Sequence, residues 1–472
     1  MGKTDVMLEF EGICAVPRCS FHNEKILAYC VNWASEHSLP CFLDAENGNV
    51  VISAPATPGY EDKPGIALQG HLDMVPVCDP GVTHDFTSDP IDVYIENGFY
   101  KARGTTLGAD DGVAAAIGFA VLSDKSLPHP ALELFLTTDE EVGMGSVAEA
   151  DLGYLKSESM INLDCGPEDN FVIGCCGGAG VNICIENKRE AFPGNVMEIE
   201  IGGLAGGHSG IEIGDEHGNA LKIMGAVLYR LRKTDYRIAG IVAEGKSNAI
   251  SNNCRVTLIT ATPKEEMEGL VAEIEADYKV CFRNTEPDLF IRVNDAETAD
   301  ALNEEMTKKL SFLLHELTFG VQNQEQVLGQ IETSVNIGLV ETTEEFIKII
   351  ISIRSSVAER IREITDRIEG LAVFAGVRTE IGEKNYPAWL PDYGNEFVEK
   401  VAVLFEQMYG RRPNIGTVHA GLECGYILKN SNIKNVVALG TNTQFEHTTR
   451  ERLQIESLNR LCEFVKKVVR EL

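Results

Sequence analysis

Hydrophobic positions in the N-terminal part of the chain form short apolar runs separated by stretches with helical spacing. The runs at 65–73, 129–141 and 159–166 predict buried strands, and each ends at or beside a carboxylate. Amphipathic spacing predicts a helix over 24–37, and a glycine-flanked turn leads into a small-residue helix over 108–124. Strands that alternate with helices are typical of an α/β sheet with both faces covered.

From about residue 184 the pattern changes to strand-like segments with helical patterns between them. Their order predicts two β-α-β-β-α-β-like units, an α+β layer whose helices lie on one face. The expected strands are 196–203, 236–245, 253–262, 288–295, 331–340, 349–355 and 371–381, and the expected helices are 219–233, 264–281, 298–317 and 357–370.

A break marked by proline and glycine at 386–394 precedes a return of the α/β pattern. We therefore predict an α/β/α domain with a mixed, mainly parallel sheet, interrupted by an inserted α+β domain. The expected boundaries are 1–183 and 389–472 for the two parts of the α/β domain, and 184–388 for the insertion.

The net charge of the chain limits the classes of binding partner that we expect. The 472 residues include 41 basic and 72 acidic side chains, which gives a formal net charge of −31. Such a surface repels phosphate backbones and anionic lipids, so we expect no nucleic-acid and no membrane partner. It suits cations such as metal ions or amines, although solubility explains the same charge. No apolar run approaches the roughly 18 residues that a membrane span needs.

The cysteines indicate the compartment. Thirteen are scattered from Cys14 to Cys462, and no C-x-x-C spacing occurs, which disfavours a zinc ribbon or a cysteine-based redox enzyme. The N-terminal segment has no basic stretch followed by an apolar one, so a secretory signal is not expected. We predict a reduced, cytoplasmic protein.

Several expected strands end in side chains that bind metals, and Asp110 lies on the turn entering the 108–124 helix. In an open α/β sheet these ends lie at one edge, so the side chains are expected to converge. Imidazole and carboxylate together suit Zn²⁺ or a similar ion, and two ions at ~3.5–4 Å would need a shared carboxylate. Each motif alone has a plain structural explanation, such as a helix cap or a solvated acidic rim. The residues concerned are His71, Asp73, Asp110, Asp111, Glu140, Glu141, Asp164 and His447.

Six motifs carry a resemblance to a known family: GHLDMVPV (70–77), ARGTTLGADDGVAAA (102–116), TTDEEVGMGS (137–146), NLDCG (162–166), GGHSG (206–210) and EHTTRERL (446–453). They resemble the co-catalytic dizinc peptidases of the aminoacylase and carboxypeptidase clan. Within that clan the sequence is similar to the aminoacyl-histidine dipeptidases, also called cytosolic non-specific or Xaa-His dipeptidases, over essentially the whole chain. The resemblance implies a catalytic α/β/α domain, an inserted lid and dimerisation domain, and a homodimer.

The resemblance implies a ligand set for two metal ions. His71, Asp110 and Asp164 match the ligands of one ion, while Asp110, Glu141 and His447 match those of the other. Asp110 would then bridge both ions. The expected cofactors are two divalent ions, Zn²⁺ first, with Mn²⁺ or Co²⁺ also compatible.

It also implies the catalytic roles nearest the metals. Glu140 matches the general base, and Asp73 matches the residue that orients His71. A carboxylate two residues from a ligand histidine can accept the proton of its second ring nitrogen. Aspartate at 164 resembles the aminopeptidase and dipeptidase members, whereas carboxypeptidases tend to carry glutamate there.

Four further residues are candidates on the substrate side. His208 matches a histidine that stabilises the oxyanion and comes from the partner subunit in dimeric relatives. Asn248 and Arg354 match substrate-binding positions, and a planar guanidinium suits the carboxylate of a dipeptide. An ordinary strand-edge ion pair also explains Arg354. Glu423 is a candidate for contact with the substrate amine.

Two positions depart from the pattern expected for this branch. Asp111 stands where asparagine is expected, and Glu446 precedes His447 where a small residue or proline is expected. The second change would affect substrate choice or affinity, in a direction that the sequence leaves open.

The sequence thus predicts metal-dependent hydrolysis of dipeptides, Xaa-His and other unblocked ones, by water activated at a dinuclear centre. The partner is a small peptide substrate, and a second copy of the chain binds through the insertion. Three alternatives keep the same metals: an aminoacylase, a carboxypeptidase and a tripeptidase. A non-catalytic metal-binding scaffold is the alternative from another class.

Overall fold

The computed structural model describes residues 2–297, 300–382 and 385–472. It divides into two compact units, each described here by itself. We call Met1–Cys175, Trp389–Thr417 and Leu422–Leu472 the discontinuous unit, and Cys176–Ala388 with Val418–Gly421 the inserted unit. The boundary expected at 183/184 falls inside strand β9 (Gly177–Glu186), which belongs wholly to the inserted unit.

The discontinuous unit contains an eight-stranded mixed sheet, which confirms the predicted fold class. Its four central strands, in the order β6-β3-β7-β21, are parallel, whereas β1 pairs with β2, β2 with β6 and β21 with β8 in antiparallel fashion. The strands in sheet order are β1 (Cys41–Asp44), β2 (Asn49–Ala54), β6 (Leu132–Thr137), β3 (Ile66–His71), β7 (Ser159–Asn162), β21 (Asn435–Ala438), β8 (Asn170–Cys175) and β20 (Asn414–Val418).

Apolar helices cover this sheet. Nearly every residue of α3 is buried, because alanine and glycine allow it to pack closely against β3, and a Cβ on Gly118 would overlap Leu134. Amphipathic α11 buries Phe464 against Phe171 and Phe405. The helices are α1 (Asp5–Cys14), α2 (Glu24–Glu36), α3 (Ala109–Leu122), α4 (Gly145–Ala148), α9 (Glu396–Tyr409), α10 (Glu423–Asn430) and α11 (Ile455–Glu471), and a small sheet contains β4 (Val93–Glu96), β5 (Phe99–Ala102), β22 (Thr443–Gln444) and β23 (Arg452–Gln454).

The inserted unit contains two antiparallel sheets with the same strand order. If the four strands of each β-α-β-β-α-β unit are numbered along the chain, both sheets have the order second, third, first, fourth. One unit comprises β11 (Asn195–Gly202), α5 (Ala220–Arg230), β12 (Tyr236–Val242), β13 (Cys254–Thr260), α6 (Lys264–Cys281) and β14 (Phe290–Asp295). The other comprises β9, α7 (Glu304–Glu316), β17 (Ile331–Thr342), β18 (Phe346–Ser355), α8 (Ala358–Ala375) and β19 (Arg378–Ile381), with β16 (Gly320–Gln324) beside β17. Short segments complete it: β10 (Arg189–Glu190), β15 (Ala301–Leu302) and a 3-10 turn, η1 (Leu231–Lys233).

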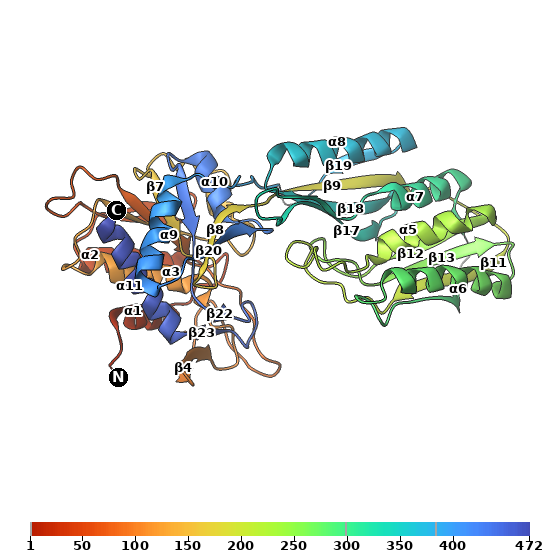
Figure 1. Ribbon diagram of the computed structural model, residues 1–472. Helices are drawn as coiled ribbons and strands as arrows, with labels where there is room; N and C mark the ends of the chain where they lie inside the picture. Colours follow the sequence, from red (N-terminus) through yellow and green to blue (C-terminus); the bar gives the residue numbers. More distant parts are fainter. Residues whose placement is uncertain (1, 298–299, 383–384) are drawn as a thin grey trace. The chain divides into compact units, whose positions relative to one another are not determined.

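Within the inserted unit, one β-α-β-β-α-β unit is nested inside the other. Strand β9 precedes the whole unit that contains β11 to β14, yet it pairs with β18 and β19 of the other (Figure 1). The glycine-rich start of β9 hides its strand pattern in the sequence. Glycine is needed there: a Cβ on Gly178 would lie 2.3 Å from the ring of Tyr386.

Two expected elements differ at their ends. Helix α8 continues to Ala375, where a strand was expected from 371, and it ends at Gly376 in the left-handed conformation (φ 64°). Glycine adopts this conformation without strain, so it terminates the helix and β19 begins only at Arg378. Helix α7 begins at Glu304 instead of 298, and residues 298–299 lie outside the described part. No helix within the described ranges is both long and apolar enough to cross a bilayer.

Candidate metal centre

Three of the five candidate ligands lie at or just after the carboxyl ends of three neighbouring parallel strands of the main sheet. His71 ends β3 and pairs with Thr137, the last residue of β6, so Glu140 and Glu141 follow beside it. On the other side of β3, Asp164 follows the end of β7. The convergence predicted from strand order is therefore present in the fold.

Asp110 lies between two imidazoles. Its Oδ1 is 3.1 Å from His71 Nε2 and its Oδ2 is 3.1 Å from His447 Nε2. His447 Nε2 also lies 3.0 Å from Glu141 Oε2, and His71 Nε2 lies 3.9 Å from Asp164 Oδ1. The other four predicted ligands thus lie next to Asp110 or next to one of its two histidine partners.

Two sets of three ligand atoms in this cluster are close enough to hold a cation. One set comes from His71, Asp110 and Glu141, the other from His71, Asp111 and Asp164, and within each set the atoms lie within 4.8 Å of one another. Oε1 of Glu141 is buried and has no hydrogen-bond partner among the described residues. A buried carboxylate oxygen without a partner is costly, so it fits a bound cation.

Asp111 is the position where asparagine was expected. Its Oδ2 accepts the backbone N–H of His71 at 3.2 Å, and its Oδ1 accepts that of Ala114 at 3.3 Å. Burial raises the pKa of Asp111 well above its usual value. The side chain therefore ties the end of β3 to the first turn of α3.

Asp73 connects the histidine to the glutamates. Its Oδ1 lies 3.4 Å from His71 Nδ1 and accepts the backbone N–H of Glu140 at 3.1 Å, while Oδ2 accepts the hydroxyl of Ser20 at 2.7 Å. Burial opposes its ionisation, but the hydrogen bond and charge of His71 and the Ser20 hydroxyl hold the pKa of Asp73 below its usual value. The backbone carbonyl of Asp73 lies closer still to His71 Nδ1, at 3.1 Å, so Asp73 keeps Nε2 of His71 turned toward Asp110.

Burial makes the Glu140 carboxylate bind a proton more tightly than an ordinary carboxylate does. Burial raises its pKa to about 8, although the nearby His71 charge lowers it, and the carboxylates of Glu423 and Glu141 raise it further. Cations bound beside it would bring this pKa down. A pKa near neutrality is what a general base requires.

Glu423 was expected to face substrate, but it is only 2% exposed. Its Oε2 accepts hydrogen bonds from Gln69 Nε2 at 2.6 Å and Thr137 Oγ1 at 2.7 Å. Gln69 in turn accepts from Asn162 at 2.6 Å, and Asn162 accepts the backbone N–H of Asp164 at 3.2 Å. This chain crosses three strands beneath the ligands, and polar residues inside apolar runs were its only signal in the sequence.

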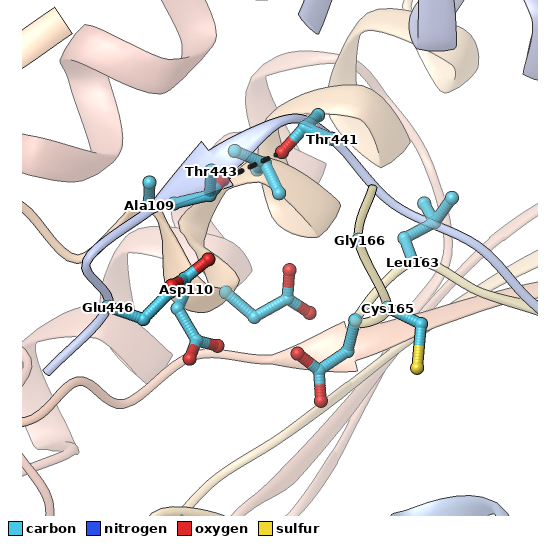
Figure 2. A pocket seen from close by; sticks show the side chains of 11 residues that line it. Ala109, Asp110, Leu163, Cys165, Gly166, Thr441, Thr443 and Glu446 are labelled. Atoms are coloured by element: carbon cyan, nitrogen blue, oxygen red, sulfur yellow. Dashed lines mark hydrogen bonds between the residues drawn. The ribbon is translucent and has the colours of Figure 1, made fainter. Parts of the chain in front are cut away.

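A pocket of about 270 Å³ opens beside the cluster. Asp110, Asp111, Asp164 and Glu446 supply its carboxylates, and Leu163 and Val113 its apolar wall. Figure 2 shows Glu446 and Asp110 lining the same pocket as Cys165 and Thr443. The pocket is therefore acidic as well as adjacent to the candidate ligands.

The inserted unit holds three of the predicted substrate-side residues. His208 Nδ1 accepts the backbone N–H groups of Gly210 and Ile211, at 3.2 and 3.1 Å, so the neutral ring carries its proton on Nε2. The backbone carbonyl of Asn248 accepts the N–H of Ser209 at 2.9 Å.

Arg354 lies on β18, and its Nη1 donates to the hydroxyl of Tyr386 at 2.7 Å. His419 was missed in the sequence although it begins the HAGLECG motif. Burial and the Arg354 charge lower the pKa of His419 to about 4, and its Nε2 is 2.7 Å from Ser334 Oγ. Arg354 thus stands beside a neutral histidine and a phenol, which suits an anionic group of a ligand.

Metal uptake should release protons. Hydrogen bonds to Asp110 and Glu141 raise the pKa of His447 to about 10, so below that pH a binding cation must displace its proton. We expect apparent Zn²⁺ affinity to rise with pH from about 6 toward 10, by up to tenfold per unit from this group. Calorimetry in buffers of different ionisation enthalpy measures the protons released. His447→Asn should release fewer protons per ion, and equal release by both proteins would contradict the expectation.

Comparison with known proteins gives the family. The model of "Peptidase family M20/M25/M40" matches residues 67–471. The cytosol non-specific dipeptidase of Escherichia coli (strain K12) is 33% identical over 469 residues, which is 98% of this chain and 96% of that protein.

Solved structures agree. The aminoacylhistidine dipeptidase of Vibrio alginolyticus matches with a TM-score of 0.91 and 31% identity, covering 99% of this chain and 96% of that one. The aminopeptidase PepT of Bacillus cereus shares the fold at a TM-score of 0.57 and 17% identity, over 99% and 98%. The resemblance inferred from the motifs is confirmed. The chain belongs to peptidase family M20/M25/M40.

Proposed function

We propose that this protein is a cytoplasmic dipeptidase that cleaves unblocked dipeptides, those of the Xaa-His type among them, with two divalent cations. The observation that carries the proposal is the Asp110 carboxylate, which presents one oxygen to His71 and the other to His447. Membership of a peptidase family supports it. The names of the Escherichia coli and Vibrio alginolyticus relatives support the choice of dipeptides and, for the former, of compartment.

The donor set fits the proposed metals. His71, Asp110 and Asp164 would hold one ion, and Asp110, Glu141 and His447 the other. Imidazole with carboxylate suits Zn²⁺, and Mn²⁺ or Co²⁺ are compatible. When bound, the two cations would lower the pKa of water and polarise the scissile carbonyl.

Glu140 is the group we assign to proton transfer. Its carboxylate takes the proton of the attacking water and passes it to the leaving amine. Asp73 supports this role because it holds the backbone of Glu140 and the ring of His71 at once.

The substrate-side roles go to the inserted unit. Arg354 binds the C-terminal carboxylate of the dipeptide, since a guanidinium can donate two parallel hydrogen bonds to it. His208, with its Nε2 proton, stabilises the developing oxyanion, and Asn248 contributes to binding. The buried Glu423 supports the ligand-bearing strands rather than meeting the substrate amine.

Glu446 lines the pocket but stands outside the proposed ligand set, and it favours unblocked substrates over N-acylated ones. Glu446 adds a carboxylate beside His447, so a free α-ammonium group is attracted where an N-acyl group gains nothing. The unexpected acid at this position therefore argues against an aminoacylase.

A substrate panel tests the function. After chelation we expect no hydrolysis of Ala-His, β-Ala-His, Leu-Gly, Ala-Ala-Ala or N-acetyl-Leu, and after addition of Zn²⁺, Mn²⁺ or Co²⁺ we expect cleavage of unblocked dipeptides alone. The released amino acids are measured by amine derivatisation. Cleavage of the tripeptide or the acylated residue would favour a tripeptidase or an aminoacylase, and no turnover with any metal would favour a scaffold.

Glu140→Gln tests the general base. Removing the proton acceptor should lower kcat by about 10²–10⁴-fold, because general acid–base catalysis contributes that much. Bound metal, measured by elemental analysis of the dialysed protein, should stay the same. Glu149→Gln, an exposed neighbour, is the control and should keep full activity. Retention of activity by Glu140→Gln would remove the assigned role.

We further propose a homodimer through the inserted unit. Strand β19 lies at the edge of its five-stranded sheet, and Ile381 on it is 86% exposed. Near the end of α8, Val373 and Phe374 are 77% and 81% exposed. Among the described residues β19 pairs with no strand on its outer side, and such an edge beside exposed apolar side chains is suited to pairing with a second copy.

Sedimentation velocity tests this interface. Phe374→Asp combined with Ile381→Asp should convert the dimer into a monomer, because each change would bury an unpaired charge. Val280→Asp, at a 64% exposed position on α6, should leave the dimer unchanged. A dimer that survives the double substitution would place the interface elsewhere.

A further inference from the structure

The backbone turn that carries Asp110 is held by a carboxylate outside the proposed ligand set. Glu451 is 3% exposed and accepts four consecutive backbone N–H groups with its two oxygens. Oε2 accepts from Leu107 at 2.8 Å and Gly108 at 2.9 Å, and Oε1 accepts from Ala109 at 2.8 Å and Asp110 at 3.3 Å. The side chain therefore fixes the whole turn up to the bridging residue.

The same carboxylate connects this turn to His447. Glu451 ends a short turn in which its N–H donates to the carbonyl of Thr448 at 3.1 Å, and the Thr448 hydroxyl donates to the carbonyl of Phe445 at 2.7 Å. His447 lies within this turn. Glu451 therefore connects the backbone that carries Asp110 with the backbone that carries His447.

Arg18 holds the turn from its other side. It is 1% exposed, and its Nη1 donates to the carbonyls of Leu72 and Asp73, at 2.7 and 3.3 Å, while Nη2 donates to the carbonyl of Gly108. Gly108 has a φ of 69°, and a Cβ there would lie 2.5 Å from Nη2. Arg18 thus joins the turn to the end of β3, next to His71.

We propose that Glu451 is a positioning residue that fixes Asp110 relative to His447 and so sets the affinity of the ion bound between them. The proposal rests on the ligand assignment above but not on the identity of the substrate. Residues that orient ligands from behind typically contribute 10–100-fold in metal affinity. His71 and Asp164 do not depend on the Glu451 turn, so the ion proposed to lie between them and Asp110 should be affected less.

Glu451→Gln is the sharpest variant. Glutamine has nearly the same shape, but its amide keeps one acceptor oxygen and presents an NH₂ group to two N–H donors. Two of the four hydrogen bonds to this side chain are therefore lost, and two backbone N–H donors are left without an acceptor.

Glu133 offers a matched control. It is 8% exposed, and its carboxylate accepts the backbone N–H of Lys156 at 3.0 and 3.1 Å and that of Ser157 at 2.8 Å. It lies at the beginning of β6, whereas the candidate ligands follow the end of that strand. Glu133→Gln should weaken the fold in a similar way without disturbing the metal turn.

The experiment is a Co²⁺ titration of the full-length protein and both variants, followed by visible absorption and by competition with a chelator. We expect the unchanged protein and Glu133→Gln to bind two Co²⁺ ions. In Glu451→Gln the ion assigned to Asp110, Glu141 and His447 should bind about 10–100-fold more weakly, with a changed absorption spectrum. Equal affinities for all three proteins, or the same loss in both variants, would overturn the proposal. Thermal midpoints without metal separate loss of stability from loss of affinity.

Two more variants cover the case in which Glu451→Gln does not fold. Glu451→Asp keeps both acceptor oxygens on a shorter side chain that no longer reaches all four N–H groups, so it should bind metal more weakly than the unchanged protein. Arg18→Lys should also weaken metal binding, because one ammonium replaces a fork that reaches three carbonyls. Unchanged affinity in Arg18→Lys together with no loss in Glu451→Asp would overturn the proposal. If the unchanged protein binds two ions but cleaves no dipeptide, the proposed function fails and the positioning role stands.

Discussion

Repulsion between carboxylates is the constraint on which this structure depends. Asp110, Glu140 and Asp164 share one edge of the sheet with Asp111 and Glu141, and burial together with mutual repulsion raises the pKa of several of them. Such a cluster is costly in a medium of low dielectric constant unless protons or cations neutralise it. The two histidines on either side of Asp110 compensate part of the charge, and bound cations would compensate the rest. The carboxylate cluster is therefore suited to divalent ions.

Regular strand pairing and buried hydrogen bonds hold the metal-ligand side chains in place. The spacing of three adjacent parallel strands sets the separation of the ligands at their ends. Beneath these ligands, hydrogen bonds from Glu423 through Gln69 to Asn162 connect the strands. The turn bearing Asp110 has no such register, so Glu451 and Arg18 hold it by its backbone. A preorganised site of this kind loses little conformational freedom when ions bind.

The inserted unit has a different architecture, built from antiparallel sheets. Its two larger sheets share the same order of four strands, and one β-α-β-β-α-β unit is nested inside the other. The first strand of the inserted unit, β9, and its last, β19, are therefore paired neighbours. Its polar centre combines Arg354 and Tyr386 with a neutral His419, a set of donors suited to an anion. The pocket of the discontinuous unit carries Glu446 outside the proposed ligand set, a carboxylate suited to a cationic group.

The sequence by itself determined the strands that carry the chemistry and most of the proposed site residues. Apolar runs mark β3, β6 and β7, and the polar residues at their ends are separated from them by only a few positions, so local spacing suffices.

Other features depend on pairs of residues far apart in the chain. Glu451 and Leu107 are separated by 344 positions, and Gln69 and Glu423 by 354. Nothing in the local pattern of an exposed-looking EHTTRERL segment or of HAGLECG indicates such contacts. Only the tertiary structure decided that Glu423 is buried, that Glu451 holds the metal turn, that β9 belongs to the insertion, and that Asp110 faces two histidines at once, because each of these follows from which distant segments the packing brings together.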